Sequence, residues 1–433
     1  MQSNVTFVGS LCFYKPSQNQ QEIMAKFEVT KITSTEDSFF DRQERIDWWE
    51  QDKLKNATVL VVGAGAIGNE TLKNLALLGV GNILITDFDD ISKSNLSRTV
   101  LFRKGDEGKR KAQTAAERIK EMALSDDFKV NYFEGDVVWE LGTGVYRHVD
   151  IVLGCLDNIE TRIAVNKQCY LAGTPWIDAG IYELGLRINF YQPPHAPCYQ
   201  CSLSPNQWQA ARERYSCDDF KKQVVSEGKI PTVQIASALV GALQVQEAIK
   251  FLCGQDVAVG KQIYYQGKTN DFDVFDMPEN PDCWAHQASY DEIISLDLDT
   301  DILLKDFLKE ISKVEHSGEG ATLDFRGDRT FVKNMSCRTC QKQIEFYRPS
   351  FRIFDYESHC EECRTEGKNE EDKQTPAPKQ TIGQFNLETT EERLLNFSLK
   401  ELGVPILHVV AVQDTDGKHK YYEMTGDKKK LFS

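Results

Sequence analysis

The sequence lacks long hydrophobic runs and an excess of positive charge, and both absences limit what the chain can be. Its apolar runs, such as 59–62 and 151–153, are far too short to cross a bilayer. No basic segment followed by an apolar stretch opens the chain, so we expect no signal peptide, no membrane association and a cytoplasmic location. The net charge of −15 argues against a nucleic-acid partner.

The sequence also lacks a long internal repeat, and its 433 residues exceed a typical single domain, which favours one large core plus a smaller module. Apolar residues make up 41% and charged residues 27%, as in a globular protein. The 12 cysteines lie largely in paired CxxC-like knuckles. That arrangement is typical of zinc in a reducing compartment rather than of a disulfide framework.

Strand and helix signals alternate through the first part of the chain. The apolar runs that predict strands are 58–62, 82–86, 129–133 and 150–154. The helical patterns are 41–54, 69–78, 109–122 and 232–252. Such alternation predicts an α/β fold with a doubly wound, mostly parallel sheet and right-handed crossovers.

The character of the sequence changes after about residue 290. We therefore expect an N-terminal extension over 1–38, a large α/β domain over 39–290, and a small zinc-containing α+β region over 291–433. Residues 366–380 are charged and contain proline, which predicts a linker or long loop. Strand-like residues 406–412 and 420–423 flank a turn with Gly417 and predict a terminal β-hairpin.

A GxGxxG motif lies between the first strand and the next helix, where a nucleotide-binding loop requires it. Gly63 permits the tight turn, Gly65 lets the backbone approach a phosphate, and Gly68 permits close helix packing. Asp87 follows the second strand, 19 residues after Gly68, where a carboxylate can accept ribose hydroxyls. Alone, this motif is typical of NAD- or FAD-binding proteins.

Further polar residues follow the strands and favour a different nucleotide. Asn95 and Arg98 lie beyond the second strand, residues 108–111 add a basic cluster, and Asp157 follows the fourth strand. The cluster alone could equally be a solvated helix start. Together, several cations and a carboxylate at strand ends suit a triphosphate with Mg²⁺ better than a dinucleotide.

In this order the motifs resemble the ThiF/MoeB/HesA superfamily, the Rossmann-like adenylating core of ubiquitin-activating enzymes, over about 39–287. One departure is Phe39-Phe40, where members often have Arg-Tyr. The matching elements are an arginine segment at 41–43, GxGxxG, DxDxxxxxNLxR at 87–98, GxxK at 108–111 and CxDN at 155–158.

The resemblance implies roles for individual residues. Asp87 would bind ribose, Asp157 would bind Mg²⁺, and Arg42 would enter the neighbouring subunit's site, which implies a homodimer. Asn95, Arg98 and Lys111 would bind the phosphates. The expected ATP-binding set is Gly63, Gly65, Gly68, Asp87, Asp89, Asn95, Arg98, Lys111 and Asp157.

The expected chemistry follows from charge. The substrate carboxylate is ionised at neutral pH because its pKa is about 3.5, so the reaction requires no general base. It must attack the α-phosphorus of ATP, and two anions repel. Arg42, Arg98 and Lys111, with Mg²⁺ on Asp157, would offset that repulsion and the charge that grows on pyrophosphate.

Two cysteine sets predict two structural zinc sites. The first zinc site begins with Cys198 and Cys201, and members of the resembling family usually complete it with a second CxxC. Here Cys283 and His286 have that spacing, which implies a Cys₃His site. A surface His286 beside an incomplete site is the alternative. The second set has the zinc-ribbon spacing C-x₂-C-x₁₉-C-x₂-C. It either binds a partner or only stabilises a small module, and its ligands are Cys337, Cys340, Cys360 and Cys363.

One further cysteine is a candidate nucleophile. Cys217 lies in a polar segment between the first knuckle and the long helix, where family members that form a covalent carrier adduct have their cysteine. Two nearby arginines favour its thiolate and two aspartates oppose it, so an incidental loop thiol is the alternative. Cys155, Cys169 and Cys253 lie in apolar patterns and are expected to be buried.

The leading hypothesis is ATP-dependent activation of a ubiquitin-like protein through its C-terminal glycine, with a thioester on Cys217 and transfer to a conjugating enzyme. The alternative is an adenylyltransferase for a sulfur-carrier protein, without thioester transfer. The zinc ribbon and the absence of a rhodanese-like cysteine loop favour protein conjugation. A non-catalytic carrier-binding scaffold and a peptide-amidating relative remain open.

Overall fold

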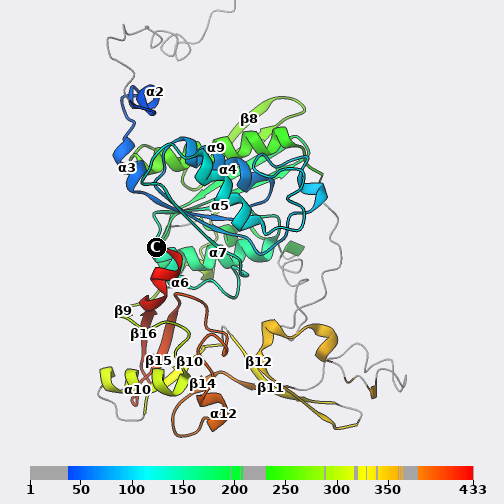
Figure 1. The fold of residues 1–433 in the computed structure, drawn as a ribbon, viewed down its shortest axis with the longest axis vertical. Helices are drawn as coiled ribbons and strands as arrows, with labels where there is room; N and C mark the ends of the chain where they lie inside the picture. The colour runs from blue at the N-terminus through cyan, green and yellow to red at the C-terminus, as the bar shows by residue number, and fades with distance from the viewer. Residues whose placement is uncertain are drawn as a thin grey trace, which may run out of the picture.

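The computed structural model describes most of the chain, and Figure 1 shows its ribbon. The described residues are 38–195, 197–204, 206–207, 231–286, 289–315, 320–327, 329–337, 340–358, 360, 362–363 and 379–432. Cys217, most of the predicted linker and nearly all of the predicted N-terminal extension lie outside these ranges.

An eight-stranded sheet forms the centre of the larger part, in the order β3-β2-β1-β4-β5-β6-β7-β8. The first five strands in this order pair in parallel, and β6, β7 and β8 each pair antiparallel with the strand before them. The strands are β1 (Thr58–Val62), β2 (Asn82–Thr86), β3 (Lys129–Phe133), β4 (Ile151–Gly154), β5 (Trp176–Tyr182), β6 (Gly185–Tyr191), β7 (Lys261–Gln266) and β8 (Asp271–Asp276). The predicted α/β class with a mostly parallel sheet is confirmed.

Helices cover both faces of this sheet, because alternate side chains of each strand point to opposite sides. Val59 and Val61 of β1 pack in one hydrophobic core with α4 (Ala66–Leu77), α5 (Lys111–Met122) and α9 (Gln234–Leu252). Leu60 and Val62 pack in a second core with α6 (Thr143–Arg147) and α7 (Ile159–Ala172). In Figure 1 these two groups of helices lie above and below the sheet.

The predicted helix over 41–54 is instead two short helices, α2 (Asp41–Glu44) and α3 (Gln51–Asn56). The segment between them places Trp49 against the first core, and its indole N–H donates to Gln51 Oε1 at 2.9 Å. Burial of this aromatic ring outweighs continuation of the helix.

Among the described helices, α9 has the length and hydropathy of a membrane span. It packs against α4 and β5, and its polar residues Gln244 and Glu247 are buried with its apolar ones. Contacts with the sheet therefore account for its apolar composition.

The C-terminal region contains a five-stranded sheet in the order β14-β10-β15-β16-β9. The predicted hairpin is confirmed, because β15 and β16 pair antiparallel with Val409 opposite Glu423. The elements are β9 (Ile293–Leu296), α10 (Leu304–Glu315), β10 (Thr322–Asp324), β14 (Gln384–Phe385), α12 (Glu392–Leu395), β15 (Val409–Gln413), β16 (His419–Met424) and α13 (Lys428–Leu431).

A smaller three-stranded sheet, in the order β12-β11-β13, carries the second cysteine set. Its strands are β11 (Phe331–Ser336), β12 (Gln343–Pro349) and β13 (Lys379–Ile382), so the last two residues of the predicted linker belong to a strand. Among the described residues, the short 3₁₀ helices are η1 (Lys93–Asn95), η2 (Tyr199–Ser202), η3 (Trp284–His286), η4 (Ser350–Arg352), η5 (Asp355–Ser358) and η7 (Thr425–Asp427).

The C-terminal region packs directly on the α/β part. Leu407 and Leu431 are buried in the second core beside Leu141 and Val145. Glu423 of β16 accepts hydrogen bonds from Arg147 (3.0 Å), and its other oxygen lies 2.6 Å from His148 Nε2. The two parts therefore share a hydrophobic core and partly buried polar contacts.

Candidate functional site

A cavity of about 760 Å³ opens at the carboxyl ends of β1, β2 and β4. Ligands bind at this edge in open α/β sheets, because the loops that follow parallel strands converge there. The cavity is lined by eight of the predicted site residues, namely Gly63, Gly65, Asp87, Asp89, Asn95, Arg98, Lys111 and Asp157.

The three glycines of the motif have different structural roles. Gly63 has φ of +97°, and a Cβ there would lie 2.4 Å from the Cys155 carbonyl oxygen. A Cβ on Gly68 would lie 2.0 Å from the Gly63 carbonyl oxygen, so Gly68 packs under the loop and does not line the cavity. Gly65 borders open space and precedes α4, whose first N–H groups are available to an anion.

Two carboxylates and a lysine form a charged group at the end of β2. Asp87 accepts backbone hydrogen bonds from Ala64 and Asp89, both at 2.8 Å, and burial raises its pKa against the opposing effect of Lys111. Lys111 Nζ donates to Asp89 Oδ2 at 2.7 Å. Burial alone would lower the pKa of Lys111, but Asp87 and Asp89 outweigh it and raise that pKa. The lysine is therefore held in its charged form beside the glycine loop.

Arg98 and Asp157 add one charge of each sign. In the part of the chain that the structure describes, the Arg98 guanidinium lines the cavity without a hydrogen-bond or ion-pair partner. Asp157 is exposed and accepts only from the neighbouring Asn158 Nδ2, at 3.1 Å, among the described residues. Asn158 in turn caps α7 by accepting from the Thr161 N–H at 2.8 Å. The arrangement presents a cation to an anionic ligand and a carboxylate oxygen to a divalent metal ion.

Sequence reasoning missed an ionic group in the wall of the cavity, which Arg162 and Arg187 line. Arg162 Nε donates to Asp178 Oδ1 at 2.7 Å, and Arg162 Nη2 donates to the Leu156 carbonyl at 2.6 Å. Arg187 lies 3.3 Å from the other oxygen of Asp178. Because buried charges are rare unless paired, an aspartate inside the apolar strand 176–179 was the signal that could have revealed this group.

The cavity also contains a cysteine, but its chemistry is unsuited to nucleophilic attack. Burial raises the pKa of Cys155 to about 12, and its Sγ donates to Gln244 Oε1 at 3.4 Å. Cys169 and Cys253 are buried as expected. Cys217 lies outside the described residues, so its role stays a prediction.

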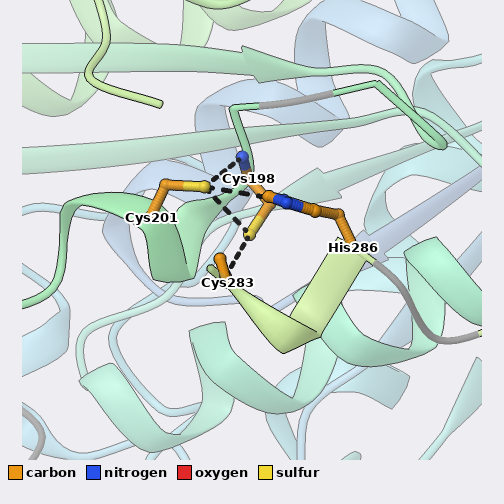
Figure 2. Close-up of side chains that lie close together, drawn as sticks. All are labelled: Cys198, Cys201, Cys283 and His286. Carbon is orange, nitrogen blue, oxygen red and sulfur yellow. Dashed lines mark hydrogen bonds between the residues drawn. The ribbon is translucent and has the colours of Figure 1, made fainter. Parts of the chain in front are cut away.

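The first predicted metal set converges as Figure 2 shows, with Cys198 and Cys201 on one side and Cys283 and His286 on the other. The Cys198 sulfur lies 3.7 Å from those of Cys201 and Cys283, and the Cys201 sulfur lies 3.6 Å from His286 Nδ1. Tetrahedral zinc with bonds of about 2.3 Å separates its sulfur ligands by about 3.8 Å. The four side chains therefore fit a Cys₃His zinc site.

Burial raises the pKa of Cys198, with further contributions from Cys201 and Cys283. Without a nearby cation the Cys198 thiol would stay protonated, so the group is suited to a metal ion rather than to free thiolates.

The second cysteine set also converges. The sulfurs of Cys337 and Cys363 lie 3.7 Å apart, and those of Cys340 and Cys360 lie 3.8 Å apart. All four ligand atoms lie within 4.8 Å of one another. These separations also fit tetrahedral zinc.

Arg42 does not lie near the cavity of its own chain. Gln43 Nε2 donates to the Leu78 carbonyl at 3.1 Å and the Phe40 ring lies against Gly79, so α2 contacts the C-terminal end of α4. The cavity lies at the N-terminal end of α4, whose 12 residues span about 18 Å. In Figure 1, α2 lies at the edge of the α/β part, next to α3 along the chain.

Comparison with known proteins identifies relatives. The family model described as "ThiF family" matches residues 40–285. The chain is 29% identical to "Adenylyltransferase and sulfurtransferase MOCS3" of Culex quinquefasciatus, over 56% of this chain and 53% of the relative. It is also 29% identical to "Sulfur carrier protein ThiS adenylyltransferase" of Escherichia coli (strain K12), over 51% of this chain and 82% of the relative.

A further relative is "Ubiquitin-like modifier-activating enzyme 5" of Dictyostelium discoideum, 28% identical over 56% of this chain and 66% of the relative. The chain spans about half the length of the MOCS3 proteins it matches, 53% and 51% in two of them. Among solved structures, E. coli MccB with ATP is 24% identical over 58% of this chain and 75% of that chain, with a TM-score of 0.48.

Proposed function

Because the chain belongs to the ThiF family, we propose that it uses ATP to adenylate the C-terminal glycine carboxylate of a ubiquitin-like or sulfur-carrier protein. The observation that carries the proposal is the cavity at the strand ends. It combines the N–H groups of a glycine loop with a charged Lys111 and an exposed Asp157. It also contains the Arg98 guanidinium, which has no partner among the described residues. A triphosphate and an approaching carboxylate need this concentration of positive charge.

The reaction forms one bond and breaks one. A carboxylate oxygen of the carrier attacks the α-phosphorus, and the bond from that phosphorus to the bridging oxygen of pyrophosphate breaks. Lys111 and Arg98 bind the phosphates and offset the repulsion between the two anions. Asp157 is the carboxylate that would hold Mg²⁺, which supplies further positive charge when bound.

A second step would follow if the carrier is a ubiquitin-like modifier. The Cys217 thiolate attacks the acyl carbon, AMP leaves, and the resulting thioester passes the carrier to a conjugating enzyme. The buried Cys155 cannot substitute for Cys217, because its high pKa keeps it protonated. The sulfur-carrier function is the second candidate, supported by the similarity to MOCS3 and the ThiS adenylyltransferase.

Carrier-dependent exchange of pyrophosphate into ATP tests adenylation. With candidate carriers that end in Gly-Gly, we expect Arg98→Ala and Asp157→Ala each to lower exchange by about 100-fold, because each removes a preorganised charge. Lys104→Ala is the matched control, since this exposed lysine lies outside the cavity lining. Full exchange in both site variants would show that the assignment is wrong.

Non-reducing gels then separate the two candidate functions. A reductant-sensitive carrier adduct that disappears in Cys217→Ala but persists in Cys155→Ala would establish a modifier-activating enzyme. Intact exchange without an adduct would favour the sulfur-carrier function and make Cys217 a loop residue.

We also propose that the enzyme acts as a homodimer in which Arg42 enters the partner's cavity. The position of α2 at the far end of its own α4 supports this arrangement. Ile235, Leu239 and Ala242 are exposed and follow one face of α9, which suits an apolar contact with a second copy.

Mixing two inactive variants tests the exchange of Arg42. An equal mixture of Arg42→Ala and Asp157→Ala chains should recover about a quarter of the wild-type activity, because half of the dimers are mixed and each has one complete site. If Arg42 acts within its own chain, or not at all, the mixture recovers nothing beyond the sum of the two variants.

A further inference from the structure

The loop after β3 connects the nucleotide cavity with the C-terminal region. Gly135 and Val137 line the cavity, and residues 139–142 contact the C-terminal region. The Asp87 N–H donates to the Phe133 carbonyl at 3.3 Å, so the loop starts beside the carboxylate expected to bind ribose. Its lining residues therefore lie at the nucleoside end of the cavity.

Backbone contacts hold the far end of this loop. The Ile406 N–H donates to the Glu140 carbonyl at 3.1 Å, and the Gly142 N–H donates to the Ile406 carbonyl at 2.9 Å. The approach is so close that a Cβ on Gly142 would lie 2.5 Å from the Ile406 oxygen.

Side chains next to the three-stranded sheet reinforce this contact. The Trp139 ring stacks on Phe351 with centroids 5.1 Å apart and planes 6° from parallel. Arg329 Nη1 donates to the Trp139 carbonyl at 2.8 Å. Phe351 lies in η4, which follows β12 directly. The chain therefore runs without a break from the three-stranded sheet to the residue that contacts the loop.

Glu140 connects the two ends of the loop. Its Oε2 accepts from the Asp136 N–H at 2.9 Å, and its Oε1 accepts from Arg352 Nη2 at 3.3 Å. Asp136 lies between the two lining residues Gly135 and Val137. Arg352 is therefore two hydrogen bonds from the wall of the cavity.

We propose that the C-terminal region positions the nucleoside end of the ATP cavity through Glu140, with Arg352 as the positioning residue. The inference rests on the proposed function, since it assumes that the cavity binds a nucleotide. A loop already ordered by the C-terminal region does not lose its freedom when the nucleotide binds, which raises affinity. By reciprocity, a partner that displaces η4 would weaken nucleotide binding, and nucleotide would weaken that partner's binding.

Direct binding of adenosine, AMP and ATP to the full chain tests this proposal. Both side chains of the ion pair are partly exposed, 37% and 36%, so the effect of each change is modest. We expect Arg352→Ala and Glu140→Gln each to weaken binding about threefold, since the glutamine keeps an oxygen for the Asp136 N–H. Glu140→Ala removes both bonds and should weaken binding about tenfold.

Two features show where the effect acts and whether the fold is intact. The same factor is expected for adenosine, AMP and ATP, because the loop lies at the nucleoside end. Arg393→Ala is the matched control, since this arginine lies 3.3 Å from Glu345 and its partners are in the C-terminal region. It should bind all three ligands as the wild type does, and all variants should keep the wild-type zinc content.

If both Arg352→Ala and Glu140→Ala bind nucleotide with wild-type affinity, this inference is wrong and the proposed function is unaffected. A loss confined to ATP, with adenosine unaffected, would place the effect at the phosphates and also overturn it. A wild-type chain that binds no nucleotide would overturn the proposed function, and this inference with it.

Discussion

Gly65 and Gly68 belong to one motif, but an added methyl group would meet different surroundings at the two positions. At Gly68 it would lie 2.0 Å from a backbone oxygen that cannot move aside, so we expect Gly68→Ala to cost about 3 kcal/mol or more of stability. At Gly65 nothing lies within 4 Å, and φ is −73°. Gly65→Ala should change stability by less than about 1 kcal/mol.

In nucleotide binding the order reverses, because Gly65→Ala, the variant that keeps its stability, is the one expected to lose ATP affinity through direct contact. The Gly65→Ala methyl group would enter the cavity where we propose that a phosphate binds, so ATP affinity should fall at least about tenfold in a folded protein. Urea unfolding and ATP titration together check the pair. Equal loss of stability in both variants would contradict the separation between packing and phosphate contact.

Cys155 shows how burial sets reactivity at a single residue. With a pKa of about 12, on the order of one molecule in ten thousand carries the thiolate at pH 8. We expect iodoacetamide to leave Cys155 unmodified in the native chain and to label it after unfolding, as measured by mass spectrometry. Native labelling at the unfolded rate would mean that the side chain is accessible.

At the scale of elements, the two cysteine sets differ in the structure around them. The first set lies at η2 and η3, which pack against α7, and Tyr170 of α7 is buried with Cys198 and Cys283 in a small cluster. The second lies on the three-stranded sheet, whose own described core consists of Val332, Met335 and Ile353, with the partly buried Phe346 packed against it. So small a core does not hold a sheet together without a metal.

Metal removal should therefore act locally. With the proposed zinc on both cysteine sets, we expect Cys360→Ser to lower the zinc content from two to one per chain. It should also expose the backbone N–H groups of β11–β13 to hydrogen exchange, because the metal would hold this small sheet together. The strands of the eight-stranded sheet should keep their protection. Zinc content that stays at two per chain would refute this ligand set.

At the scale of the whole molecule, the docked hairpin should make stability depend on pH. Burial lowers the pKa of His408 well below its usual value, and Arg329 and Lys167 lower it further. Its neutral Nδ1 accepts from the Thr143 N–H at 3.4 Å. The unfolded chain then binds the proton more readily, so the contribution of His408 is complete above a pH of about 6.5 and is lost as the pH falls.

Glu423 adds a second step at lower pH. Burial alone would raise its pKa, but His148 and Arg147 outweigh it and lower the pKa, so its contribution is lost below a pH of about 4.5. The free energy of unfolding, measured between pH 8 and 5, isolates the first step. It should change by at most about 1.4 kcal/mol per pH unit. His408→Leu should flatten that slope, and an unchanged slope would contradict the assignment.

The sequence by itself determined four strands of the eight-stranded sheet and most of the nucleotide loop. Strands 58–62, 82–86 and 129–133 agree with the structure at both ends, because each is a short run of strand-forming residues bounded by turn residues. Helix starts were less accurate, since α4 begins at Ala66 rather than 69, directly after Gly65. The glycines, Asp87, Arg98 and Lys111 were found because their spacing along the chain reflects local geometry.

Only the tertiary structure decided how distant segments meet. The pairing of Arg162 with Asp178, the contact of the 134–142 loop with Ile406, and the distance of Arg42 from its own cavity all depend on strand order and on docking of the C-terminal region. Local patterns encode the period of an element and the turn that ends it. They do not encode which surfaces pack together, because that choice depends on the free energy of the whole buried core.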